Sequence, residues 1–158
     1  MRTAAALLLC ELLMSGCGLP RDASDTLGRV RNRVLRAGAA ENRPWAVDRG
    51  DRFEGIEGEL VTAIAGSVGA RIEWVRMPEF ELIAALRRRE LDLAIGGFHQ
   101  QLPWAQQIAF TRPYFSGGDG KARVLAVPPG ENAWLLHVDR EIERHKPELK
   151  RDIVQGGS

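Results

Sequence analysis

Residues Leu91-Asp-Leu-Ala-Ile-Gly-Gly97 form a short, mainly apolar run that ends in two glycines. A run of this length predicts a buried strand, and the glycines predict where the strand stops. The chain on either side alternates short apolar runs with helical patterns. We expect further strands over 34–40, 71–76 and 124–127, and helices over 56–68, from Pro78 and from Asn132, which could cap the last helix. This order predicts right-handed crossovers and an α/β fold with three layers around a mainly parallel sheet.

The composition is that of one ordinary folded domain. The chain has 158 residues, 44% of them hydrophobic and 27% charged, with 22 Lys and Arg against 21 Asp and Glu. Its pI of about 7.9 is lower than that of a typical nucleic-acid-binding domain, which exceeds roughly 9. Two cysteines are too few for a disulfide framework or a four-cysteine zinc site. We therefore expect no nucleic-acid partner, no metal and no cofactor.

The first residues resemble a targeting signal. Arg2 precedes an apolar run over 3–14, which is too short to span a bilayer and has the length of a signal-peptide core. The small residues before Cys17 resemble the lipobox of bacterial lipoproteins, whose cysteine is lipidated and becomes the mature N-terminus. We expect a signal peptide over 1–16 and a polar tether over 17–32. The alternative is an ordinary secretory signal with an incidental cysteine, and both place the mature protein outside the cytoplasm.

Two of the predicted strands end in loops that carry binding-type side chains. In parallel sheets, ligands bind outside the carboxyl ends of the strands. The loop after the first strand contains Glu41, Arg43 and Trp45, and the loop after the third contains Gly97, Phe98 and His99. Glycine N–H groups could face an anion, and an arginine suits a carboxylate. Trp45 and Phe98 offer flat apolar walls, so the two loops predict a binding site for a small polar ligand.

These segments resemble the family 3 extracellular solute-binding proteins of bacterial ABC transporters, which bind amino acids and similar small polar solutes. The matching stretches lie within 34–115 and are Val34–Gly38 with Pro44-Trp45, Phe53–Leu60, Leu82–Leu86, Leu91–Gly97 and Phe110–Phe115. The second is similar to the family's Gly-Phe-Asp-x-Asp-Leu helix start and the last to its Phe-Ser-x-Pro-Tyr hallmark. The resemblance implies one lobe of a periplasmic-binding-protein-like fold of type II, without catalysis.

The sequence departs from the family pattern in two places. In the family, a threonine and, five residues later, an arginine follow the glycine loop, and the arginine clamps the ligand's α-carboxylate. Here His99 and Trp104 stand at those positions. Family members also build a second lobe after the Pro-Tyr hallmark, whereas only residues 116–122 precede the returning strand here. We expect residues 33–158 to form a single lobe in which a short loop replaces the second lobe.

A single lobe leaves one side of its ligand exposed to solvent. We therefore expect the lobe to bind a small polar solute weakly, or to present it to a membrane transporter or sensor. The candidate ligand-binding residues are Glu41, Arg43, Trp45, Gly97, Phe98, His99 and Trp104. The expected location is the periplasm or cell envelope, with a lipid on Cys17 as membrane anchor. A protein-interaction subunit without a ligand is the alternative, and a dehydratase-like enzyme using Glu41 and His99 is a remote one.

Several candidate residues also have ordinary structural interpretations. Trp45 could pack beneath its own loop, and Trp104 could start a short helix against the core. His99 and Arg43 could simply be solvated. On the last helix, His137, Glu141 and His145 share one face, which we expect to be solvated and not to bind zinc.

Overall fold

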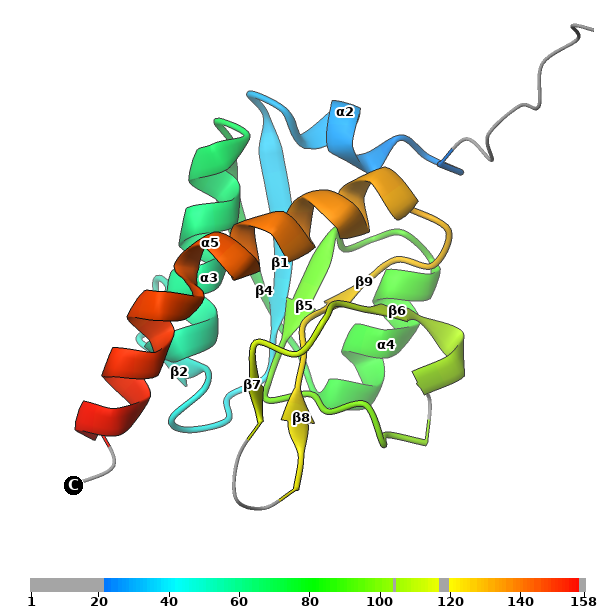
Figure 1. Ribbon diagram of the computed structural model, residues 1–158. Helices are drawn as coiled ribbons and strands as arrows, with labels where there is room; N and C mark the ends of the chain where they lie inside the picture. The colour runs from blue at the N-terminus through cyan, green and yellow to red at the C-terminus, as the bar shows by residue number, and fades with distance from the viewer. Residues whose placement is uncertain (1–21, 104, 117–119, 157–158) are drawn as a thin grey trace, which may run out of the picture.

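The computed structural model describes residues 22–103, 105–116 and 120–156 (Figure 1). The expected signal peptide, the candidate lipidation site Cys17 and the candidate ligand-binding residue Trp104 lie outside the described residues. Residues 117–119 of the short loop also lie outside them. Within the described part of the chain, no helix combines the length and apolar character needed to cross a bilayer.

A five-stranded sheet forms the centre of the fold, in the order β4-β1-β5-β9-β6. Its strands are β4 (Arg71–Arg76), β1 (Val34–Ala39), β5 (Leu93–Ile95), β9 (Ala126–Val127) and β6 (Ala109–Phe110). β1 pairs in parallel with β4 and β5, whereas β9 runs antiparallel to both β5 and β6. The predicted α/β fold is confirmed, although the last predicted strand is antiparallel. Just before β9, the N–H of Val124 donates to the Phe98 carbonyl. The chain therefore enters β9 from beyond the carboxyl end of β5.

Three helices complete the layers. α3 (Gly55–Ser67) and α5 (Asn132–Gly156) pack on one face of the sheet, and α4 (Glu79–Arg87) covers the other (Figure 1). The alternation in β5 explains this arrangement, since Leu93 and Ile95 point into the α3–α5 core while Ala94 points toward α4. The three-layer prediction is therefore confirmed.

Short elements lie at the ends of the strands. They are β2 (Val47–Asp48) paired with β3 (Phe53–Glu54), β7 (Phe115–Ser116) paired with β8 (Ala122–Arg123), and the 3₁₀ turn η2 (Ala105–Gln107). β7 and β8 pair antiparallel, so the chain turns back on itself at the point where the family resemblance predicts departure toward a second lobe.

The second half of the expected tether is folded, which corrects the sequence prediction. Helix α2 (Thr26–Val30) lies in this segment, and Thr26 and Val30 are both buried. The Glu131 carboxylate accepts hydrogen bonds from the N–H groups of Ser24 (2.8 Å) and Thr26 (2.9 Å). Polar residues that suggested a solvated linker are therefore bound to the start of α5.

The start of α5 also differs from the prediction. Asn132 is not the cap of the helix but its first residue, and it is exposed. The Asp22 carboxylate accepts a hydrogen bond from the N–H of Ala133 at 2.8 Å. Because this carboxylate comes from 111 residues away, local sequence patterns gave no sign of it.

Candidate functional site

The loops that follow β1 and β5 meet at the carboxyl edge of the sheet. The Asn42 side-chain amide donates to the Gly96 carbonyl at 2.8 Å, and the N–H of Ala40 donates to the Ile95 carbonyl at 3.1 Å. Gly97 has a φ of 72°, and a Cβ there would lie 2.4 Å from Nδ2 of Asn42. A glycine is therefore needed for the two loops to approach this closely.

Trp45, the predicted flat wall, lies at this edge. Its ring is half-buried and packs against Tyr114 and Phe115, with centroids 6.1 and 5.1 Å away. The guanidinium of Arg123 lies over the same ring, 5.0 Å from its centroid, and Arg123 Nη1 donates to the Gly97 carbonyl at 2.9 Å. Trp45 therefore packs against its neighbours, as the structural interpretation predicted, and its ring also meets the cation of Arg123. Its role as a wall for a ligand stays a prediction.

Sequence reasoning missed Arg123. It comes from β8, on the returning side of the hairpin, and the tertiary fold brings it next to Gly97. The one available signal was that this arginine immediately precedes the apolar run over 124–127. A cation therefore lies beside Gly97 at the carboxyl edge. Trp104, which stands at the family's clamp position in the sequence, lies outside the described residues.

The glycine N–H groups of the β5 loop are bound by an internal carboxylate. Glu57 is fully buried, and its Oε2 accepts hydrogen bonds from the N–H groups of Gly96 (2.8 Å) and Gly97 (2.9 Å). Tyr114 donates its hydroxyl to Oε1 of the same carboxylate at 2.7 Å. The prediction that these N–H groups face an anion holds, but the anion is Glu57 and not a ligand. Burial raises the pKa of Glu57, and its hydrogen bonds to Tyr114, Gly97 and Gly96 oppose that rise.

Phe98 is not a wall of the site, which corrects the prediction. Its side chain is 0% exposed and packs in the core beneath α4, with Phe110 6.5 Å away between ring centroids. The positive φ of Gly97 turns the chain at this point. The next side chain is therefore directed into the core rather than toward the edge.

Glu41 and Arg43 lie at the surface and pair with each other. Arg43 Nη2 is 3.0 Å from Glu41 Oε1, and the two side chains are 64% and 50% exposed. Such an exposed pair contributes at most about 1 kcal/mol to stability. Both groups can therefore be recruited by a ligand at little cost.

His99 is half-buried and forms an isolated backbone bridge with Arg123. Its Nδ1 is buried and has no hydrogen-bond partner in the described part of the chain. Glu41 is engaged by Arg43, so the acid–base pair that the enzyme hypothesis requires is not assembled between Glu41 and His99 in this structure.

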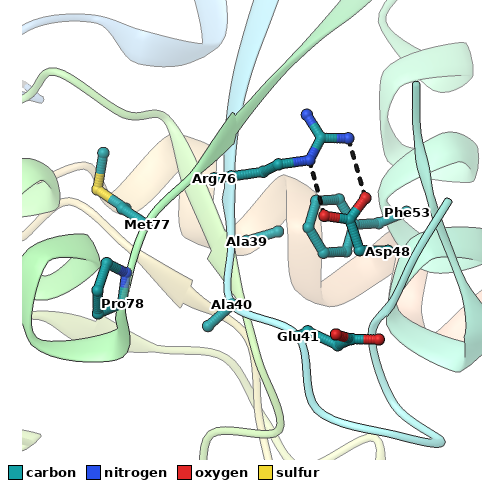
Figure 2. Close-up of a pocket in the computed structure, with 8 residues that line it drawn as sticks. All are labelled: Ala39, Ala40, Glu41, Asp48, Phe53, Arg76, Met77 and Pro78. Atoms are coloured by element: carbon teal, nitrogen blue, oxygen red, sulfur yellow. Dashed lines mark hydrogen bonds and ion pairs between the residues drawn. The ribbon is translucent and has the colours of Figure 1, made fainter. Parts of the chain in front are cut away.

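A pocket of about 430 Å³ opens at the carboxyl ends of β1 and β4 (Figure 2). Its lining residues are Ala39, Ala40, Glu41, Asp48, Phe53, Arg76, Met77 and Pro78. Arg76 holds the Asp48 carboxylate through Nε at 2.8 Å and Nη2 at 3.0 Å, and these bonds lower the pKa of Asp48. The pocket adjoins the β5 loop, because a Cβ on Gly96 would lie 3.1 Å from Ala40.

The histidines of α5 are engaged by the protein. His137 Nε2 lies 2.8 Å from Ser67 Oγ, and its ring stacks on Trp134 at 5.8 Å. Glu141 is buried and bonds Arg144, so the expectation of a solvated face is wrong for that residue. Among the described residues, no three His, Cys, Asp or Glu side chains are grouped so that they could hold a metal ion.

Comparison with known proteins places this geometry in a family. The bacterial extracellular solute-binding proteins, family 3, match residues 35–156. The membrane-bound lytic murein transglycosylase F of Idiomarina loihiensis is 32% identical over 70% of the chain, and the probable histidine-binding protein of Neisseria gonorrhoeae is 28% identical over 81%. The arginine-binding extracellular protein ArtP of Bacillus subtilis is 25% identical over 65%. The chain spans 24%, 47% and 39% of these three relatives, respectively.

Solved structures share the fold of a single lobe. A point mutant of the arginine-bound form of domain 1 from TmArgBP superposes with a TM-score of 0.67 at 24% identity, covering 78% of this chain and 98% of that one. An ancestral arginine-binding protein bound to arginine gives a TM-score of 0.66 at 15% identity, covering 80% and 98%. The family that the sequence motifs suggested is thereby confirmed. The chain belongs to the family 3 bacterial extracellular solute-binding proteins and has the fold of one of their lobes.

Proposed function

We propose that this lobe binds a small amino-acid-like solute at the carboxyl edge of its sheet, outside the cytoplasm and without catalysis. The observation that carries the proposal is the guanidinium of Arg123 over the Trp45 ring, next to Gly97. A guanidinium has five N–H donors in a planar fork that suits a carboxylate. Arg123 thus supplies, from the returning strand, the cation that the sequence lacks at position 104.

The neighbouring pocket is suited to the side chain of such a solute. Its volume of about 430 Å³ lies within the range of small-molecule sites, roughly 300–1,000 Å³. Phe53, Met77 and Ala39 supply apolar surface. Among the lining groups, Glu41 and Asp48 are acidic and only Arg76 is basic, which favours a side chain that is neutral or cationic over one that is anionic.

A lone lobe offers less enclosure than two. The arginine-bound domain 1 from TmArgBP is itself a single domain, so a lone lobe of this fold can hold an amino acid. Here the edge is open to solvent, and screening weakens each polar contact. We expect dissociation constants between about 10 µM and 1 mM.

The N-terminal sequence and the relatives support a cellular setting for this function. We propose a signal peptide over 1–16, a lipid on Cys17, and a location in the periplasm or cell envelope, where the lobe serves a membrane transporter or sensor. We also propose that the β7–β8 hairpin and its loop over 116–122 take the place of a second lobe. Antiparallel pairing of Phe115 with Arg123 supports this assignment.

Titration calorimetry against the standard amino acids tests the function. At least one basic or neutral polar amino acid should bind, and Arg123→Gln should weaken that binding by about tenfold or more. Arg52→Gln, which alters another exposed arginine, serves as the charge-matched control and should bind as the unaltered protein does. No heat and no rise in melting temperature with any amino acid would overturn the proposal, as would unchanged binding by the Arg123 variant.

A second candidate is a recognition module within a larger membrane-associated protein. The similarity to a membrane-bound lytic murein transglycosylase, of which the chain spans 24%, favours it. The apolar patch that a ligand-free interaction subunit would need around Trp45, Phe98 and Trp104 loses one member, because Phe98 is buried. A solute-binding role therefore has the stronger support.

A further inference from the structure

Exposed arginines without carboxylate partners gather at the amino edge of the sheet. Arg31 lies in the turn between α2 and β1, Arg33 immediately precedes β1, and Arg71 opens β4. The N–H of Arg71 donates to the Arg33 carbonyl at 2.8 Å, so the two residues are neighbours. In the described part of the chain, none of the three side chains pairs with a carboxylate. We call these three residues the amino-edge cluster.

One further exposed arginine, Arg140 of α5, acts on the same histidine as Arg31. Burial lowers the pKa of this histidine, His137, and these positive charges lower it further. Four carboxylates near this edge already have partners or are buried. Asp22 and Asp25 accept backbone hydrogen bonds, Glu90 pairs with Arg88, and Glu131 is buried.

The opposite edge has a different pattern. There Arg43, Arg49, Arg52 and Arg76 each pair with an acidic side chain. These four arginines of the carboxyl edge therefore have acidic partners, whereas Arg31, Arg33 and Arg71 of the amino edge have none among the described residues.

The N-terminal segment enters the fold at the amino edge. Asp22, the first described residue, binds the N-terminal turn of α5, close to where β9 ends (Figure 1). Only five peptide steps separate Asp22 from Cys17, which is at most about 18 Å of extended chain. A lipid on Cys17, as in the proposed function on which this step rests, would hold the amino edge close to the bilayer.

We propose that the amino-edge cluster lies on an anionic lipid surface, so that the solute site at the carboxyl edge faces away from the membrane. The two edges are opposite ends of the same strands. Figure 1 shows α2 and the start of β1 at one end of the molecule and the β7–β8 hairpin at the other. Whatever covers the solute site must then approach from the aqueous side.

The attraction of one arginine to an anionic membrane is modest, but the attraction of the whole cluster is sufficient. An arginine near an anionic membrane surface improves partitioning by about fivefold. The attraction extends about one Debye length, roughly 8 Å at physiological salt. A lipid chain and a basic patch together give the two signals that stable anchoring requires.

Vesicle sedimentation tests the cluster without the lipid. The chain from Gly18, which contains the whole described fold, should bind vesicles of equal parts phosphatidylglycerol and phosphatidylcholine more strongly than pure phosphatidylcholine vesicles. Arg33→Glu with Arg71→Glu should lower this partitioning by about 30-fold or more at low salt. The matched control is Arg52→Glu with Arg112→Glu, two exposed arginines of the carboxyl edge, and it should change partitioning less than about threefold. Equal losses in both variants, or no preference for anionic vesicles, would overturn the proposal.

Fluorescence quenching tests the orientation of the lipidated protein. A fluorophore attached through Gly66→Cys, at the end of α3 near the amino edge, should be quenched by brominated lipid, whereas one attached through Gln101→Cys should not. Stronger quenching at position 101 would contradict the proposal. Mass analysis of Cys17 reports separately whether the lipid is present, and calorimetry reports whether the solute binds. A failure of either is therefore distinct from a failure of the vesicle experiment.

Discussion

The hydroxyl of Tyr114 donates to the carboxylate of Glu57 at 2.7 Å, and both side chains are buried. The same carboxylate binds the N–H groups of Gly96 and Gly97. One acidic side chain at the start of α3 therefore fixes both the loop after β5 and the segment that leads to β7. The loops at the proposed solute site are therefore held by an internal hydrogen-bond network.

Removing either partner of this pair should destabilise the fold, and the two losses should not add. Tyr114→Phe removes one hydrogen bond to Glu57 and should lower the free energy of unfolding by about 1–2 kcal/mol. Glu57→Ala leaves two buried N–H groups without a partner and should cost about 3 kcal/mol or more. Urea denaturation of both variants and of the double variant should give a coupling energy of about 0.5–3 kcal/mol. Strictly additive losses would show that the hydrogen bond contributes nothing.

Asp92 should make stability depend on pH in the acid range. Its buried carboxylate accepts hydrogen bonds from Arg36 and Arg29. Burial alone would raise the pKa of Asp92, but the bonds from Arg36 and Arg29 outweigh it and bring the pKa below its ordinary value. The stabilisation is therefore present above an unfolded-state pKa of about 3.9 and is lost as pH falls through the lower folded-state value.

Asp92→Asn should remove this contribution. We expect the variant to lose about 2–3 kcal/mol near neutral pH and to unfold with a shallower pH dependence below about pH 4. Urea midpoints measured across that range test it. Asp51→Asn, at an exposed carboxylate, is the control and should preserve the parental pH curve. If the Asp92 variant showed the same loss of stability at acid pH as the parent protein, this role of Asp92 would be contradicted.

Two glycine-to-alanine substitutions should have opposite effects on stability. A Cβ on Gly38 would lie 2.4 Å from Leu91 and 2.5 Å from Leu82, inside the core beneath α4. Gly38→Ala should therefore cost about 1–3 kcal/mol through overpacking. A Cβ on Gly66 meets nothing within 4 Å on an exposed part of α3, so Gly66→Ala should stabilise by about 0.5–1 kcal/mol. Thermal melts of the two variants should shift in opposite directions, and a shared direction would contradict the packing described.

Glu131 should control the order of the N-terminal segment. Its carboxylate holds the N–H groups of Ser24 and Thr26. Glu131→Ala should speed amide hydrogen exchange in α2 and lower stability by about 1–3 kcal/mol, because two donors lose a charged acceptor. Glu143→Ala, at an exposed residue of the same α5 helix, should leave exchange in α2 unchanged. Equal protection of α2 in both variants would show that other contacts hold the segment.

Several elements were predictable because their signals are local. The buried strand over 91–95, the period-two pattern over 71–76 and the acid-rich helix start after Pro78 all correspond to observed elements. The antiparallel course of β9 and the folding of α2 were not predicted. Both depend on contacts more than a hundred residues apart or across the sheet, such as Glu131 with Thr26 and Ala94 with Ala126.

The features of the candidate site also divide into those set by local sequence and those set by tertiary contacts. The sequence by itself determined the family, the α/β architecture and the two loops that meet at the carboxyl edge, since periodicity and motif order are properties of neighbouring residues. Only the tertiary structure decided which side chains lie at the proposed solute site. It buried Phe98 under α4, bound the glycine N–H groups to Glu57 and brought Arg123 over Trp45. These outcomes depend on packing and on satisfying buried polar groups between distant segments, and no local pattern records them.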